Sequence, residues 1–133
     1  FNDGITNMVD EERLICSSEQ LQDSGDGIRF EVAWDERREP AFVIRYMGEA
    51  KAYINRCAHV PYELDWQPGK FFDRDGLLLI CSVHGATYDP ATGACMGGPC
   101  YERGLWPIQV AERDGKVFLD HDKVHLVKES NNG

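Results

Sequence analysis

The sequence predicts an all-β domain that is interrupted by an inserted metal site built from loops. Short segments rich in β-branched and aromatic residues predict strands, and turn signals separate them at short intervals. Between 56 and 101 this pattern gives way to closely spaced Gly, Pro, Cys and His, which is typical of a site built from loops. The 133 residues suffice for one domain with a buried core.

The predicted strands lie on both sides of the insertion. They cover residues 13–16, 28–34, 41–47 and 51–55 before it, 77–81 within it, and 107–112, 117–120 and 124–127 after it. Turns that contain glycine separate them at 25–27, 47–49, 73–76 and 113–115. One short helical turn is predicted at 17–22, with Ser18 as its cap and Leu21 pointing inward. The single domain 1–133 then consists of base strands at about 10–55 and 101–128, which pair across an insertion at about 56–100.

The net charge limits the classes of partner. At −9 the chain would be repelled by nucleic acid and by anionic membranes. An acidic surface suits docking to a positively charged protein face, or simply keeps the protein dispersed. No apolar segment approaches the roughly 20 residues that span a bilayer, and residues 1–10 have neither the basic start nor the apolar stretch of a secretory signal. We therefore expect a protein of the cytoplasm, with no membrane span and no nucleic-acid partner.

Two pairs of candidate metal ligands stand in the insertion. Cys57 and His59 form a C-x-H pair, and after 21 intervening residues Cys81 and His84 form a C-x-x-H pair. Two thiolates and two imidazoles would satisfy a tetrahedral zinc ion. A structural zinc site usually has ligands of one kind in each half, whereas each half is mixed here, as an asymmetric two-iron centre could use. The total of five cysteines is odd, which argues against a fully paired disulfide framework and favours metal binding in a reducing compartment.

The residues that follow the second pair extend the pattern. His84 is followed by Gly85, by an aromatic residue at Tyr88, by a turn containing Gly93, and by a Gly-Gly-Pro segment that ends at Pro99. From 57 to 99 the chain resembles the Rieske [2Fe–2S] family, whose cluster loops have the forms C-x-H and C-x-x-H-G and whose Gly-Pro loop covers the cluster. The resemblance implies an antiparallel β-sandwich or barrel base that carries a cluster-binding subdomain.

By this resemblance the chain holds one [2Fe–2S] cluster of the Rieske type. Its site would be formed by the inner-iron ligands Cys57 and Cys81, the outer-iron ligands His59 and His84, and, beside the cluster, Tyr88 and Pro99. Neutral imidazoles in place of anionic thiolates lower the negative charge at one iron and so stabilise the reduced cluster.

Departures from the respiratory branch of the family point to its ferredoxin-type branch. The respiratory branch joins its two loops with a disulfide, at the positions that Tyr62 and Val83 occupy here. It also has a serine that donates to a cluster sulfur at the position of Ala86, while the hydroxyl of Tyr88 could still donate. With fewer donors to sulfur, we expect a potential in the low part of the roughly −150 to +300 mV Rieske range.

The ferredoxin-type resemblance implies an electron carrier and not an enzyme. Such a carrier receives one electron from a reductase and delivers it to an oxygenase or another redox enzyme. A Rieske oxygenase would need a separate iron site with two His and one carboxylate, and the only other histidines are His121 and His125, which we expect on a solvated acidic edge. Two alternatives stay open: an accessory subunit resembling the small subunit of nitrite reductase, and a redox-sensing or zinc-stabilised interaction module.

The interval between the two ligand pairs is longer than in compact ferredoxin-type proteins. We expect its extra residues, 65–66 and 70–73, to form a flap beside the cluster. For the aromatic residues Trp66, Phe71 and Phe72, core packing is favoured over docking of a partner.

Three cysteines and one charged segment have simpler interpretations. Cys95 and Cys100 bracket the Gly-Gly-Pro turn and could form a disulfide, but buried or free thiols are favoured. Cys16 lies on a predicted strand and is expected in the core. The mixed charges at 35–39 predict a solvated hairpin tip.

Overall fold

A computed structural model of the chain describes residues 13–34, 37–56, 64–65, 69–81, 85–98, 104–120 and 124–127. Before the insertion lie β1 (Leu14–Ser17), the 3-10 helix η1 (Ser18–Gln20), β2 (Ile28–Trp34), β3 (Arg37–Tyr46) and β4 (Glu49–Ile54). Within it lie β5 (Leu79–Ile80), β6 (Thr87–Tyr88) and β7 (Cys95–Gly97). After it lie β8 (Pro107–Ile108), β9 (Val110–Arg113), β10 (Lys116–Leu119) and β11 (His125–Leu126). The predicted all-β class is confirmed.

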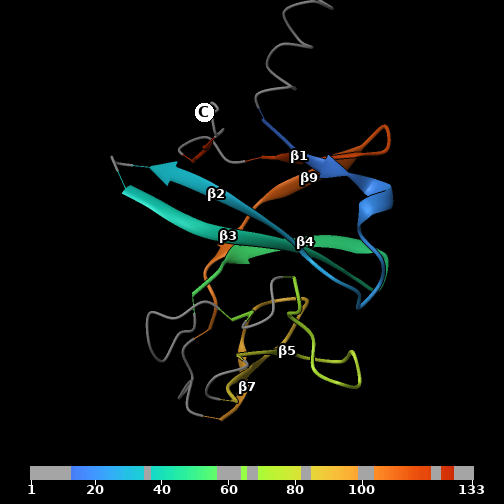
Figure 1. Ribbon diagram of the computed structural model, residues 1–133, viewed down its shortest axis with the longest axis vertical. Coiled ribbons are helices and arrows are strands. Elements are labelled where there is room, and N and C mark those ends of the chain that lie inside the picture. The colour runs from blue at the N-terminus through green and yellow to red at the C-terminus, as the bar shows by residue number, and fades with distance from the viewer. Residues whose placement is uncertain are drawn as a thin grey trace, which may run out of the picture.

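The strands form three antiparallel sheets (Figure 1). The five-stranded sheet, in the order β11-β2-β3-β4-β8, lies in the middle, with the sheet β1-β10-β9 on one side and the small sheet β5-β6-β7 on the other. Strand β4, which precedes the insertion, pairs with β8, which follows it, through Ala52 opposite Ile108 and Tyr53 opposite Pro107. The expected pairing of the strands that flank the insertion is therefore confirmed.

Strand β3 is buried on both faces. Its side chains alternate, so that Ala41 and Val43 pack in the core between the two larger sheets, whereas Phe42 and Ile44 pack in the core against the insertion. All four residues are 0% exposed. The two cores therefore share this strand, and the insertion is packed directly on the base.

The predicted strand at 107–112 is in fact two strands. β8 belongs to the five-stranded sheet and β9 to the sheet β1-β10-β9, and the chain changes sheets at Gln109. The carbonyl of Gln109 accepts a hydrogen bond from Asp120 N–H at 2.9 Å. The sequence does not predict β6 and β7, because two or three residues are too few for an alternating pattern to be visible.

The tip of the β2–β3 hairpin is shorter than predicted. β3 begins at Arg37, so 37–39 is strand rather than solvated tip. Glu39 is only 5% exposed, and its carboxylate pairs with Arg37 and with Arg56. A paired carboxylate can be buried at a position where its charge alone predicts exposure.

The helical turn predicted at 17–22 is the shorter 3-10 helix η1 at 18–20. Its cap is Ser17 and not Ser18, since Ser17 N–H donates to Gln20 Oε1 at 2.9 Å. Leu21 is 4% exposed and lies in the core, as predicted.

An ion pair joins the two larger sheets. The guanidinium of Arg45 on β3 donates to both carboxylate oxygens of Glu112 on β9, at 2.6 and 3.0 Å, and to backbone carbonyls including that of Leu21. These hydrogen bonds lower the pKa of Glu112 and raise the pKa of Arg45, because they favour the charged forms of both side chains.

We predict that Glu112→Gln lowers the free energy of unfolding by about 1 kcal/mol at neutral pH. The folded-state pKa of Glu112 lies below its unfolded value, so its charge stabilises the fold above the unfolded pKa and that contribution disappears as the pH falls through the folded pKa. Urea unfolding followed by circular dichroism, at neutral pH and at a pH of about 3, measures the difference, which should shrink in acid. Glu49→Gln, which breaks an exposed pair with Lys51, is the control and should have little effect. An equal loss at both pH values would contradict the charge-based origin.

Candidate metal centre

The second predicted ligand pair begins at a loop closed by its own backbone. Cys81 follows β5 directly, is 0% exposed and belongs to no disulfide. Its N–H donates to the carbonyl of Ala86 and its carbonyl accepts from Gly85 N–H, both at 2.8 Å. The pairing of β5 with β6 continues this closure. His84 lies outside the described residues, but the two ends of the loop that carries it are joined.

The segment before Pro99 lies against this loop. Gly98 has a φ of +79°, and a Cβ built on it would stand 2.7 Å from the carbonyl oxygen of Gly85. Next to it, the hydroxyl of Thr87 donates to the carbonyl of Gly97 at 3.4 Å. The glycines therefore allow the backbone at 97–98 to contact the second ligand loop, while Pro99 itself lies outside the described residues.

Tyr88 lies in the centre of the small sheet. It stands on β6, opposite Leu79 on β5 and Cys95 on β7, and is 0% exposed. Cys95 is disulfide-bonded, with a partner outside the described residues. The expectation that Cys95 is a free or buried thiol is therefore wrong.

The first predicted ligand pair, Cys57 and His59, lies outside the described residues, but the chain on both sides of it is described. Asn55 N–H donates to the carbonyl of Pro40 on β3 at 2.8 Å. The side-chain oxygen of Asn55 accepts from Leu64 N–H at 2.9 Å. The chain therefore leaves the base at residue 56 and is bonded to the base again at residue 64.

The interval between the ligand pairs packs on the base sheet. The ring of Phe71 stacks on Phe42 with centroids 3.9 Å apart, and Phe72 stacks on Tyr46 at 6.2 Å. Core packing of Phe71 and Phe72 is confirmed, while Trp66 lies outside the described residues. The described part of the expected flap is therefore anchored to the base.

Contacts with the turn before β2 complete this anchor. Gly27 N–H donates to the carbonyl of Gly69 at 2.8 Å, and the hydroxyl of Ser24 donates to the carbonyl of Gly76 at 2.6 Å. A Cβ on Gly27 would stand 2.7 Å from the ring of Phe71. These contacts fix the described part of the interval along the edge of the base.

Sequence reasoning did not find the buried polar residues that frame the first ligand pair. Asn55 is 1% exposed and Asp65 is 5% exposed, although both residue types are usually at the surface. The position of Asn55 between an apolar strand and the C-x-H pair is the signal that could have identified it.

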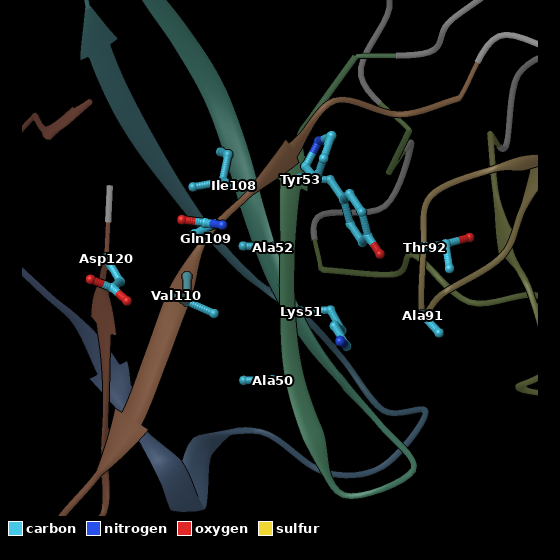
Figure 2. A pocket seen from close by; sticks show the side chains of 11 residues that line it. Ala50, Lys51, Ala52, Tyr53, Ala91, Thr92, Ile108, Gln109, Val110 and Asp120 are labelled. Carbon is cyan, nitrogen blue, oxygen red and sulfur yellow. The ribbon is translucent and has the colours of Figure 1, made fainter. Parts of the chain in front are cut away.

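A groove of about 380 Å³ lies at the joint between the base and the small subdomain (Figure 2). Lys51, Tyr53 and Thr92 line it, and Tyr53 points from β4 toward the turn that contains Thr92. The hydroxyl of Tyr53 donates to the carbonyl of Pro90 at 2.8 Å, and burial raises the pKa of this hydroxyl. Among the described residues that line the groove there is neither Cys nor His, so they offer no thiolate or imidazole ligand.

The remaining described residues considered in the sequence analysis lie in the core or at the surface. Cys16 is 6% exposed in the core between the larger sheets, and burial raises the pKa of its thiol to about 11, so its core role is confirmed. His125 is exposed on β11, and His121 lies outside the described residues. In the part of the chain that is described, no three His, Cys, Asp or Glu side chains are grouped to hold a metal ion, and Cys81 is the one predicted ligand within it.

The one predicted ligand among the described residues fits an iron–sulfur cluster. Cys81 is a buried thiol among apolar neighbours, on a loop fixed by two backbone hydrogen bonds, and iron–sulfur clusters are held by Cys thiolates. The model of the Rieske [2Fe–2S] domain family matches residues 11–128. The chain belongs to the Rieske family. Its cofactor is accordingly one Rieske-type [2Fe–2S] cluster.

Solved structures of Rieske proteins have the same fold. The ferredoxin of Sphingomonas yanoikuyae B1 is 27% identical, with a TM-score of 0.62, over 83% of this chain and 97% of that one. The ferredoxin of carbazole 1,9a-dioxygenase from Nocardioides aromaticivorans IC177 is 23% identical, with a TM-score of 0.62, over 80% and 93%. A complex of reduced oxygenase and oxidised ferredoxin in carbazole 1,9a-dioxygenase contains a chain that is 22% identical, with a TM-score of 0.63, over 83% and 93%.

Two further comparisons are negative. Among curated protein sequences, none matches this Rieske chain at a significant level. Across the residues that the structure describes, no helix has the length and apolar character that a membrane span requires.

We predict that Gly98→Ala destabilises the Rieske fold by about 1–3 kcal/mol more than Gly48→Ala. Both glycines have a left-handed φ, +79° and +85°, so both variants have the same kind of backbone strain. Only a Cβ at 98 meets other atoms, since nothing lies within 4 Å of one at 48. Denaturant unfolding of the two variants, followed by circular dichroism, measures the difference. Equal destabilisation would mean that the 97–98 segment does not press on the second ligand loop.

Proposed function

We propose that this Rieske protein is a ferredoxin that carries single electrons from a reductase to an oxygenase or another redox enzyme, and that it is not itself an enzyme. The supporting observation is the match to the Sphingomonas yanoikuyae B1 ferredoxin, 97% of which corresponds to this chain. This chain also covers 93% of each of the other two chains described above, so they too consist of little more than the matched domain. One of them comes from a complex of an oxygenase with its ferredoxin, which supports a partner of that class.

The proposed ligands are Cys57 and Cys81 for the inner iron and His59 and His84 for the outer iron. When bound, the cluster takes up and releases one electron at a time. As a ligand, Cys81 loses its thiol proton and remains within the apolar core of the subdomain. Each imidazole that binds iron through one ring nitrogen would keep its other ring N–H for a hydrogen bond, which a docked partner could accept.

Tyr88 and Pro99 are proposed to lie beside the cluster. Residue 86 has no hydroxyl, and Ala86 is 0% exposed, so this position donates no side-chain hydrogen bond to a cluster sulfur. Fewer donors stabilise the reduced state less, which supports a potential in the low part of the Rieske range. The close approach of Gly98 to Gly85 keeps the segment before Pro99 near the proposed second ligand loop.

The net charge of −9 supports a basic docking face on the reductase or the oxygenase. Attraction of this kind raises the rate of encounter at low salt, and the rate falls as ionic strength screens it. The proposed location is the cytoplasm; the thiol of Cys16, which belongs to no disulfide, agrees with a reducing compartment, whereas the disulfide at Cys95 does not.

The electron paramagnetic resonance spectrum of the purified protein, with iron and zinc analysis, tests the proposed cofactor site. A rhombic half-spin signal after reduction and two irons per chain support it. Rapid one-electron exchange with a reductase, slowed by added salt, then supports a carrier. A cluster that cycles but exchanges electrons with no reductase would favour a sensor or an accessory subunit, and zinc without redox activity would leave a metal-stabilised interaction module.

We predict that His84→Cys lowers the reduction potential by tens of millivolts or more, because an anionic thiolate replaces a neutral imidazole at the outer iron. Protein-film voltammetry of the cluster-loaded variant measures the change. His125→Cys makes the same substitution at an exposed position on β11 and should leave the potential unchanged. Equal potentials for the two variants and the wild type would overturn the ligand assignment.

A further inference from the structure

A buried polar cluster surrounds the place where the chain leaves the base toward Cys57 and returns after His59. We infer that Asn55 and Asp65 are positioning residues for the first pair of cluster ligands, because together they hold the two ends of segment 57–63 close to each other. We call this closed base of the segment the neck. The inference rests on the ligand assignment proposed above.

Asn55 makes the closing contact. It follows β4 directly and stands two residues before Cys57, and its side chain is almost fully buried. Its side-chain oxygen accepts from Leu64 N–H at 2.9 Å, and its backbone N–H donates to the carbonyl of Pro40 at 2.8 Å. Asn55, one residue before the last described residue ahead of the segment, is thus bonded to Leu64, the first described residue after it, and to β3.

Asp65 fixes the orientation of the Asn55 amide. One carboxylate oxygen accepts from Asn55 Nδ2 at 3.0 Å, and the other accepts from Gly69 N–H at 2.9 Å and lies 3.3 Å from Arg29 Nε. The Asp65 side chain is 0% exposed. A flipped amide would turn its NH₂ toward Leu64 N–H and its oxygen toward the carboxylate, so only one orientation satisfies every partner.

The two ligand loops are therefore closed by different means. At the second loop, backbone groups of Cys81, Gly85 and Ala86 bond to each other. Any residue except proline supplies these groups, so the closure needs no particular side chain, although the φ of +77° at Gly85 favours glycine there. At the first loop the closing groups are side chains. A substitution that removes the side-chain oxygen at 55 leaves Leu64 N–H buried without its acceptor, and a substitution at 65 changes the partner that orients the Asn55 amide.

Residue 56 is anchored as well. Arg56 pairs with the buried carboxylate of Glu39 on β3, and its N–H donates to the carbonyl of Ile54 at 2.9 Å. Both residues that precede Cys57 are therefore fixed to the base. A neck of this kind limits the positions that Cys57 and His59 can take relative to Cys81.

A side-chain exchange between the two positions tests this arrangement in the cluster-loaded protein. Asn55→Asp places the carboxylates of residues 55 and 65 face to face. With Asp65→Asn, the new NH₂ group faces either the NH₂ of Asn55 or the N–H of Gly69, depending on the orientation of the amide, so two donors oppose each other in both cases. The double variant with both changes restores complementary hydrogen-bond donors and acceptors. The carboxylate at 55 then accepts from Leu64 N–H and from the amide NH₂ at 65, and the amide oxygen at 65 accepts from Gly69 N–H.

The measurements are the rate of iron release to a ferrous chelator and the line shape of the reduced electron paramagnetic resonance signal. We expect each single variant to release iron about tenfold faster or more with a broadened signal, and the double variant to return to within about threefold of the wild type. Ser24→Ala removes one hydrogen bond between the base and the same interval without touching the neck, and it should keep both wild-type properties.

The outcomes separate the two proposals. If the wild type contains no iron and gives no half-spin signal, the proposed ligand assignment is overturned, and this inference with it. If the wild type gives the signal but both single variants match it, or the double variant is worse than either single one, Asn55 and Asp65 are not positioning residues. Should Asn55→Asp fail to fold, Asp65→Asn and the double variant still provide the comparison.

Discussion

The burial of β3 on both faces is the constraint on which the rest of the structure depends. A strand with one solvated face could support the base alone, but here Phe42 and Ile44 face the insertion while Ala41 and Val43 face the second sheet. The aromatic stack of Phe42 on Phe71 therefore connects the core of the base to the interval between the ligand pairs. Because interiors are close-packed, a change in volume on one face of β3 is transmitted to the other.

The polar contacts near the insertion follow from the same burial. Once the interval 64–80 covers one face of the base sheet, the backbone groups at its ends lose access to water and need partners. Asn55 and Asp65 supply them at one end, and Ser24 supplies one near the tip through its bond to Gly76. Buried carboxylates are costly alone, and Arg29 and Arg56 are placed to pair with Asp65 and Glu39.

The strands, the pairing of those flanking the insertion and the family were predictable because each has a local signature. Alternation marked β2, β3 and β10, and the ligand spacing with the Gly-Pro segment marked the cluster subdomain. The break at Gln109 was not predictable, because the two halves of 107–112 have the same alternating pattern and only their partners differ. Likewise, Glu39, Asn55 and Asp65 are buried because of contacts with residues elsewhere in the sequence. The propensity of a residue type for the surface does not take such contacts into account.

A four-ligand site divided between two supports keeps its geometry only if the joint between the supports is rigid. The first proposed pair follows β4 of the base, and the second follows β5 of the small sheet. The joint is stiffened where Tyr53 reaches from β4 to Pro90 and where Leu105 N–H donates to the carbonyl of Gly93 at 2.7 Å. A Cβ on Gly93 would stand 2.8 Å from the ring of Tyr53, so the close approach itself requires glycine. The base is therefore part of the frame on which the two proposed ligand pairs would be held at a fixed separation.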